Sequence, residues 1–280
     1  MKNILVPTDF SPTADHAFQL ALQIAKKENV NIHLLHVLGF NFDSALELDK
    51  LFPESPFGKE ALDHFMKGGH DELNSYIDKL KLDHNNVKKV VEIGVPSDII
   101  IEKIKKLDID MVVMGTQGAT GMKEFFLGSN AERVVRYADC PVITIKHKIN
   151  IDEVKRIVFG SDLNEISDKV IEKLKELQGI FQAEIDIVRV NTPNNFERDI
   201  ILKPLKERML SKINLNKLTV HTYNDLTIEN GLRHYAQENG AQMIAITTHG
   251  RKGFDHFVAG SIAEDITNRT TKMVWTYHFQ

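Results

Sequence analysis

The sequence predicts an α/β protein made of two doubly wound domains with parallel sheets. The first observation is an internal repeat, because KNILVPTDFS at 2–11 matches KRIVFGSDLN at 155–164, and DMVVMGTQG at 110–118 matches QMIAITTHG at 242–250. The second is that each copy alternates short apolar segments with amphipathic segments of helical period. Repeats of about 130 to 150 residues have the size of whole domains. We therefore expect domains at residues 1–148 and 152–280, joined by a short polar link.

In the first copy, strands and helices are expected to alternate along the chain. The strands are predicted at 4–6, 30–38, 87–93, 110–114 and 141–145. The helices are predicted from the apolar spacing between Ala14 and Ala25, and at 62–80, 97–106 and 129–137. The helix at 97–106 follows Pro96, a residue suited to a helix start.

The second copy follows the same order and is about 21 residues shorter between the two repeated landmarks. Its strands are predicted at 156–160, 184–190, 217–223, 243–247 and 273–277, and its helices at 166–177, 200–213, 228–236 and 261–268. Near-continuous apolar strands separated by helices indicate a parallel sheet that is covered on both faces. Right-handed crossovers then give a doubly wound domain in each copy.

Composition excludes several classes of protein. The net charge of −4 and the pI near 6.3 give no electrostatic basis for binding nucleic acid or an anionic membrane. The single cysteine, Cys140, excludes an internal disulfide framework and is typical of a reducing cytoplasm. No apolar run reaches the ~18 residues of a membrane-spanning helix, and the first residues lack a secretory layout. We therefore expect a cytoplasmic protein without nucleic-acid or membrane partners.

A glycine-rich segment after the predicted strand at 110–114 is the main candidate for a binding site. Ligands of doubly wound sheets lie beyond the carboxyl ends of the strands. Glycine allows a ligand to approach the backbone closely, and the helix beginning at Ser129 offers free N–H groups and a positive dipole end. The segment suits a phosphate chain, although it is neither a Walker A loop nor a first-turn dinucleotide fingerprint. Its glycines are Gly115, Gly118, Gly121 and Gly128.

Local structure explains part of the same pattern equally well. Ser129-x-x-Glu132 and Ser261-x-x-Glu264 both read as capping boxes, and glycines alone are compatible with turns.

Asp9 and Asp162 follow the first strand of each copy, where a carboxylate would accept hydrogen bonds from a ribose or help hold a divalent cation. The alternative, of equal weight, is that Asp9 or Ser11 caps the next helix.

These residues together resemble the universal stress protein family in its tandem two-domain form. The most specific part is Gly-x2-Gly-x9-Gly-Ser at 115–129, and the resemblance covers nearly the whole chain. It implies five-stranded sheets of order 3-2-1-4-5, of the adenine nucleotide alpha hydrolase-like type. It also implies that ATP, or AMP or ADP, is bound together with Mg²⁺. No protein residue is assigned as a ligand of the metal. The implied nucleotide site comprises Pro7, Thr8, Asp9, Val37, Met114, Gly115, Gly118, Gly128, Ser129 and Asn130.

Within that implied site, Asp9 would face the ribose, and the backbone around Thr8 and Val37 would meet the adenine. The second copy departs from the pattern, because Thr247 replaces the first glycine. We expect there a weaker or empty second site, formed by Ser161, Asp162, Gly250, Gly260 and Ser261.

The resemblance also bears on assembly and activity. Family members pair through the fifth strand, so residues 141–145 are expected to pair antiparallel with 273–277 within the chain, as an intrachain pseudo-dimer. A homodimer and unknown protein partners are compatible with this arrangement.

We expect a regulatory stress-response protein with at most slow ATP hydrolysis. The alternative is an interaction module of the same fold that binds proteins or small apolar ligands; an adenylating enzyme ranks last, for lack of a second catalytic motif.

Overall fold

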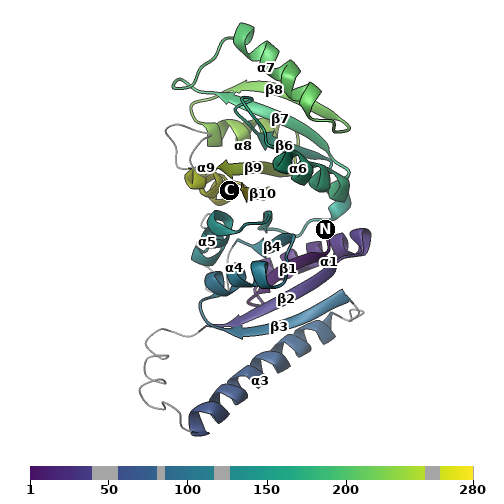
Figure 1. Cartoon of the computed structure of the whole chain (residues 1–280), viewed down its shortest axis with the longest axis vertical. Coiled ribbons are helices and arrows are strands. Elements are labelled where there is room, and N and C mark those ends of the chain that lie inside the picture. Colours follow the sequence, from purple (N-terminus) through teal and green to yellow (C-terminus); the bar gives the residue numbers. More distant parts are fainter. Residues whose placement is uncertain (40–55, 81–85, 117–126, 250–258, 280) are drawn as a thin grey trace.

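The computed structural model describes residues 1–39, 56–80, 86–116, 127–249 and 259–279. One ten-stranded sheet runs the length of the molecule in the order β3-β2-β1-β4-β5-β10-β9-β6-β7-β8 (Figure 1). Each half therefore has the predicted strand order 3-2-1-4-5, and the two halves are joined edge to edge.

The first half contains these elements: β1 (Asn3–Thr8), α1 (Pro12–Glu28), β2 (Asn31–Leu38), α3 (Pro56–Lys79), β3 (Val87–Ile93), α4 (Pro96–Lys106), β4 (Met111–Gly115), α5 (Ser129–Tyr137) and β5 (Val142–Ile145). After the short helix η2 (Ile151–Glu153), the second half contains β6 (Arg156–Gly160), α6 (Asp168–Phe181), β7 (Glu184–Asn191), α7 (Asp199–Lys212), β8 (Leu218–Asn224), α8 (Ile228–Glu238), β9 (Met243–His249), α9 (Ala259–Arg269) and β10 (Met273–Phe279).

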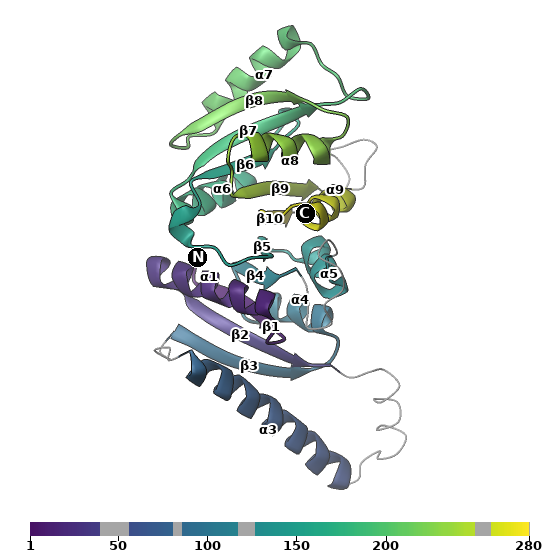
Figure 2. The same ribbon diagram turned by 180° about the vertical axis from the view of Figure 1, so that it is seen from behind.

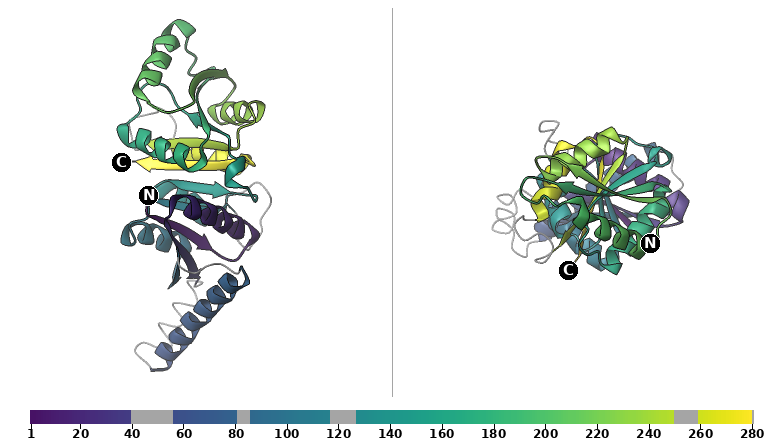
Figure 3. Two further views of the ribbon diagram at one scale, coloured as in Figure 1. Left: turned by 90° about the vertical axis from the view of Figure 1, so that its right-hand side faces the viewer. Right: turned by 90° about the horizontal axis from the view of Figure 1, so that it is seen from above.

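Helices cover both faces of the sheet, as the apolar strands predict. One core cluster joins α1, α3, α6 and α7 on one face and runs through both halves, with Phe18, Leu73, Leu174 and Met209 among its members. On the other face, α4 and α5 cover the first half and α8 and α9 cover the second (Figures 1 and 2). Figure 3 shows the two halves stacked along the long axis of the molecule.

The seam between the halves confirms the predicted antiparallel pairing. Trp275 of β10 lies opposite Ile143 of β5, and Val274 lies opposite Thr144. Trp275 is 1% exposed and its ring centroid lies 6.0 Å from that of Tyr277. Because the two fifth strands pair with each other, neither is left as an open edge.

The first helix of each half ends alike and begins differently. Asn29 ends α1 and Gln182 ends α6 in the left-handed conformation, at equivalent positions of the repeat. Ser11 caps α1 by accepting the N–H of Ala14 at 3.3 Å. The counterpart of Ser11 in the repeat is Asn164, yet α6 is capped by Ser167. The helix expected from residue 166 therefore begins later, at Asp168, and a longer connection follows β6.

Candidate functional site

The sheet reverses its strand order between β1 and β4 in the first half and between β6 and β9 in the second. At these points the connections that leave neighbouring strands diverge to opposite faces of the sheet, which leaves room for a ligand at the carboxyl ends. Pro7 and Thr8 close β1, Val37 lies near the end of β2, and Met114 and Gly115 close β4. The structure thus brings these predicted residues to one edge of the sheet.

The turn after β1 is held by its own side chains. The hydroxyl of Thr8 accepts the N–H of Phe10 at 3.1 Å, and Oδ1 of Asp9 accepts the N–H of Ser11 at 3.1 Å. Phe10 takes a left-handed conformation between them, with φ of 60°. Ser11, rather than Asp9, caps α1, so one of the two capping alternatives is realised. Asp9 keeps an exposed side chain beside the carboxyl end of β1.

The second half repeats this turn almost bond for bond. Ser161 accepts the N–H of Leu163 at 3.1 Å, and Asp162 accepts the N–H of Asn164 at 3.0 Å. Leu163 has a φ of 63°. The repeated Ser/Thr-Asp pair therefore has a structural task in both halves, whatever else it binds.

Gly115 is a glycine because α1 passes close to the end of β4. A Cβ atom at this position would lie 2.8 Å from the backbone carbon of Thr13 and 2.8 Å from its hydroxyl oxygen. Such distances are shorter than a carbon contact permits. The residue is thus required for packing between β4 and α1, independently of any ligand.

The first turn of α5 differs from the capping box read in the sequence. Gly128 is the N-cap, Ser129 is already the first helical residue, and within the described part of the chain no side chain caps this helix. The capping-box interpretation of Ser129 and Glu132 is therefore wrong, since a glycine N-cap brings no side-chain oxygen. Ser129 and Asn130 are exposed, and the turn presents backbone N–H groups that a capping side chain would otherwise satisfy. The corresponding reading of Ser261 and Glu264 fails to match the helix start as well, because α9 begins at Ala259.

The two ends of the glycine-rich segment are pinned together. The N–H of Gly128 donates to the carbonyl of Thr116 at 2.7 Å, and the N–H of Leu127 donates to Oδ1 of Asn268 on α9. Gly118 and Gly121 lie outside the described residues, as does Gly250 in the second half. Gly260 lies in the first turn of α9, and nothing is described of the Ser261 side chain.

His36 occupies space beside the expected adenine position. Its Nδ1 donates to the carbonyl of Thr8 at 3.0 Å, and its ring centroid lies 4.6 Å from that of Phe10. One lone pair of the Thr8 carbonyl is therefore already engaged.

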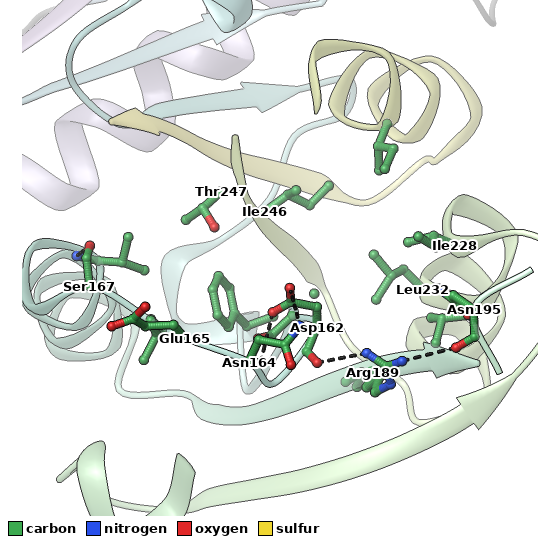
Figure 4. A pocket seen from close by; sticks show the side chains of 18 of the residues that line it. Asp162, Asn164, Glu165, Ser167, Arg189, Asn195, Ile228, Leu232, Ile246 and Thr247 are labelled. Carbon is green, nitrogen blue, oxygen red and sulfur yellow. Dashed lines mark hydrogen bonds between the residues drawn. The ribbon is translucent and has the colours of Figure 1, made fainter. Parts of the chain in front are cut away.

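A cavity of about 720 Å³ opens at the equivalent edge of the second half. Ser161 and Asp162 line it from the turn after β6, Thr247 lines it from β9, and Leu232 lines it from α8 (Figure 4). The predicted second-site residues Ser161 and Asp162 are therefore part of a real hollow. It lies where the delayed start of α6 leaves Asn164, Glu165 and Ile166 in an open connection.

Sequence reasoning missed Arg189, which also lines this cavity from β7. The side chain is 8% exposed, and its Nη1 and Nη2 donate to the carbonyls of Asp162 at 2.8 Å and Asn195 at 3.1 Å. The signal was present, since Arg189 is a cation inside the apolar segment IVRV, at the position His36 holds in the first copy.

Other chemistry is sparse among the residues that the structure describes. They contain no cluster of three or more histidine, cysteine or acidic side chains suited to a metal ion. Burial raises the pKa of the Cys140 thiol to about 12, so this cysteine is an unreactive thiol near neutral pH. None of the described helices has the length and apolar character needed to cross a membrane.

The geometry defines a tandem α/β protein with a reversal of strand order in each half. The chain belongs to the universal stress protein family, whose model matches residues 1–146 and 153–278. A universal stress protein of Synechocystis sp. is 24% identical over 301 aligned residues, covering 99% of this chain and all of that protein. One from Methanocaldococcus jannaschii is 34% identical over 152 residues, covering 52% of this chain and 82% of that protein.

Solved structures agree on the fold. A universal stress protein from Archaeoglobus fulgidus superposes with a TM-score of 0.69 at 19% identity, covering 99% of this chain and 98% of that one. At this identity the likeness supports the tandem architecture alone.

Proposed function

We propose that this universal stress protein binds an adenine nucleotide with Mg²⁺ in its first half, and that the binding is regulatory rather than catalytic. The observation that carries the proposal is the uncapped start of α5, which faces the strand-order reversal between β1 and β4. An open helix start with glycines before it favours an anion through its free N–H groups and its dipole. The resemblance of the segment 115–129 to the family pattern points to phosphates as that anion.

Each residue then has a role that follows from its place. Gly128, Ser129 and Asn130 would receive the phosphates at the helix start, while Gly115 and Gly118 would allow the chain to pass close to them. Asp9, exposed at the end of β1, would accept hydrogen bonds from the ribose hydroxyls. Val37, Pro7 and Met114 would contribute the backbone and apolar contacts around the base. The Mg²⁺ would be held through phosphate oxygens and water.

We propose a regulatory role for the binding because we identify no set of catalytic side chains among the residues that the structure describes. Occupancy would stabilise the folded chain in proportion to ligand concentration over Kd, by mass action. The contact of Leu127, the residue before Gly128, with Asn268 would carry the effect of occupancy to α9 of the second half. A surface read by partner proteins would thereby depend on the nucleotide. The cytoplasmic location expected from the sequence is part of the same proposal.

The test is thermal unfolding of the purified full chain with and without ATP and Mg²⁺, together with identification of any nucleotide released on denaturation. Gly118→Val is expected to abolish the nucleotide-dependent rise in Tm. Gly250→Val, at the equivalent place in the second copy, is the matched control and should retain it. Asp9→Ala and Asp162→Ala form a second such pair.

The competing function is an interaction module that binds no nucleotide. It is favoured by the structural tasks of Gly115 and Asp9, each of which is explained without a ligand. Equal melting curves with and without nucleotide, and no nucleotide released from the purified protein, would establish this alternative and remove the proposal.

A further inference from the structure

The second-half cavity, at the carboxyl ends of β6 and β9, combines an apolar wall with a buried cation. Val188, Val190, Leu232, Ile246 and Ile262 form the apolar wall, from β7, α8, β9 and α9. The volume of about 720 Å³ lies within the range of small-molecule sites. In Figure 4, Arg189 lies at the edge of this hollow, between Asp162 and Asn195.

The guanidinium of Arg189 is held in place but not neutralised. Within the part of the chain that the structure describes, both of its hydrogen bonds go to backbone carbonyls, and its Nε is buried without a partner. No carboxylate there lies within ion-pair distance of it, whereas Arg156 pairs with Asp186 at 3.0 Å. A buried charge without a counter-charge is costly, and a planar guanidinium is suited to a carboxylate.

The rest of the lining limits the charge of the ligand. Among the residues that the structure describes, Asp162, Glu165 and Asp168 line the cavity together with Lys212 and Arg189. A polyphosphate would meet more negative than positive charge from these described side chains. A single carboxylate would pair with Arg189 while its apolar body lies against the valine, leucine and isoleucine wall.

The cavity has a structural origin that separates it from the first half. There, Thr13 packs against Gly115 so closely that no Cβ fits. In the second copy Thr247 stands at the place of Gly115, and α6 starts only at Asp168, so Ile166, the counterpart of Thr13, lies in the connection instead of a helix. Thr247 and Ile166 both line the hollow. The replacement of the first glycine by Thr247 thus accompanies a cavity of different shape from the corresponding edge of the first half, and not only a weaker version of the same site.

We propose that the cavity of the second half binds a small monocarboxylate with an apolar body, with Arg189 as the residue that pairs with the carboxylate. This site is independent of the nucleotide proposed for the first half.

The test is calorimetric titration of the full chain with octanoate, 1-octanol and octylammonium, which share one apolar chain and differ in charge. One octanoate is expected per chain, bound about tenfold or more tightly than 1-octanol, because a charge-assisted hydrogen bond contributes that much. Octylammonium is expected to bind more weakly than either. ATP with Mg²⁺ should not displace the octanoate, whatever happens in the first half.

Variants assign the binding to this cavity. Arg189→Gln should reduce octanoate affinity to that of 1-octanol and leave 1-octanol unchanged, while Arg189→Lys should retain part of the preference. Thr247→Phe fills the hollow from β9 and should weaken both ligands. His36→Gln, at the equivalent position of the first half, is the matched control and should change neither.

Far-UV circular dichroism and thermal melting establish that each variant is folded. If Arg189→Gln does not fold, Arg189→Lys and Thr247→Phe decide the question. Equal affinity for octanoate and 1-octanol, unchanged octanoate binding in Thr247→Phe, or competition by ATP would overturn the proposal.

Discussion

The backbone N–H of Leu127, just before α5, donates a hydrogen bond to the side-chain carbonyl of Asn268 on α9. The carbonyl of Asn268 in turn accepts from Nζ of Lys146, at 2.7 Å. One residue of the second half is therefore held by two residues of the first, on either side of α5. This contact links the end of the glycine-rich segment of one half to the helix that follows the corresponding segment of the other.

Replacing Asn268 should weaken this link measurably. Asn268→Ala leaves the N–H of Leu127 without its partner, and the loss is expected to lower the free energy of unfolding by about 1 to 2 kcal/mol. If the first half binds a nucleotide as proposed, the Tm rise with ATP and Mg²⁺ should also shrink, because the residue before Gly128 has lost its anchor. Urea denaturation and thermal melting measure the two effects.

Gln237→Ala, at an exposed site on α8, provides the surface control and should change stability by less than about 0.5 kcal/mol. Identical unfolding curves for Asn268→Ala and the wild type would show that the contact contributes nothing.

A second contact across the seam is the ion pair of Arg136 on α5 with Glu264 on α9. Nε of Arg136 lies 2.8 Å from Oε1 of Glu264, so the pair also has hydrogen-bonded geometry. The arginine side chain is 39% exposed and the glutamate 16%, and solvent therefore screens part of the attraction. A double-mutant cycle with Arg136→Ala and Glu264→Ala should give a coupling free energy of about 0.5 to 1 kcal/mol that falls as salt is added. Coupling that is zero at low salt would contradict the pair.

Much of the fold could be predicted because it depends on patterns that survive in the sequence. Apolar strands and helical spacing gave the order of elements, and the family resemblance supplied the order of strands. The antiparallel seam followed from the same logic, since an isolated fifth strand would be an open edge. The turn that follows the first strand of each half can likewise be predicted from the sequence, because Thr8-Asp9 of the first copy recurs as Ser161-Asp162 of the second.

The rest depends on contacts that no local pattern records. The sequence pattern predicts Ser129 as the N-cap, whereas in the structure Gly128 is the N-cap and Ser129 is the first helical residue. A Gly-Ser pair is compatible with either position of the helix start. The sequence pattern predicts Gly115 as a ligand contact, and its close approach to Thr13 is visible only once α1 is packed on β4. Arg189 stands out in the sequence as a cation within the apolar segment IVRV, but its burial at a cavity is visible only in the folded chain.

The packing role of Gly115 can be separated from general effects of adding a methyl group. Gly115→Ala forces a Cβ to within 2.8 Å of Thr13 and should destabilise the chain by about 1 to 3 kcal/mol through overpacking. Gly179→Ala, within α6, meets no described atom within 4 Å and should stabilise it by up to about 1 kcal/mol through helix propensity. Opposite signs in urea denaturation are expected. A neutral Gly115→Ala would leave the nucleotide as the better reason for this glycine.

Lys146 gives the stability of the chain a dependence on alkaline pH. The side chain is 9% exposed, and burial lowers its pKa from 10.5 to about 8. Between pH 8 and pH 10.5 the unfolded chain therefore holds more protons at this site than the folded chain, and this residue's contribution to stability increases as the pH rises. Lys146→Met removes the titration but also the bond to Asn268. Its stability relative to the wild type should fall by on the order of 1 to 3 kcal/mol from pH 7 to pH 10. Comparing the two proteins at each pH cancels the tyrosines that ionise near pH 10. A difference that is constant across this range, in urea denaturation at matched ionic strength, would mean that Lys146 titrates as an ordinary surface lysine.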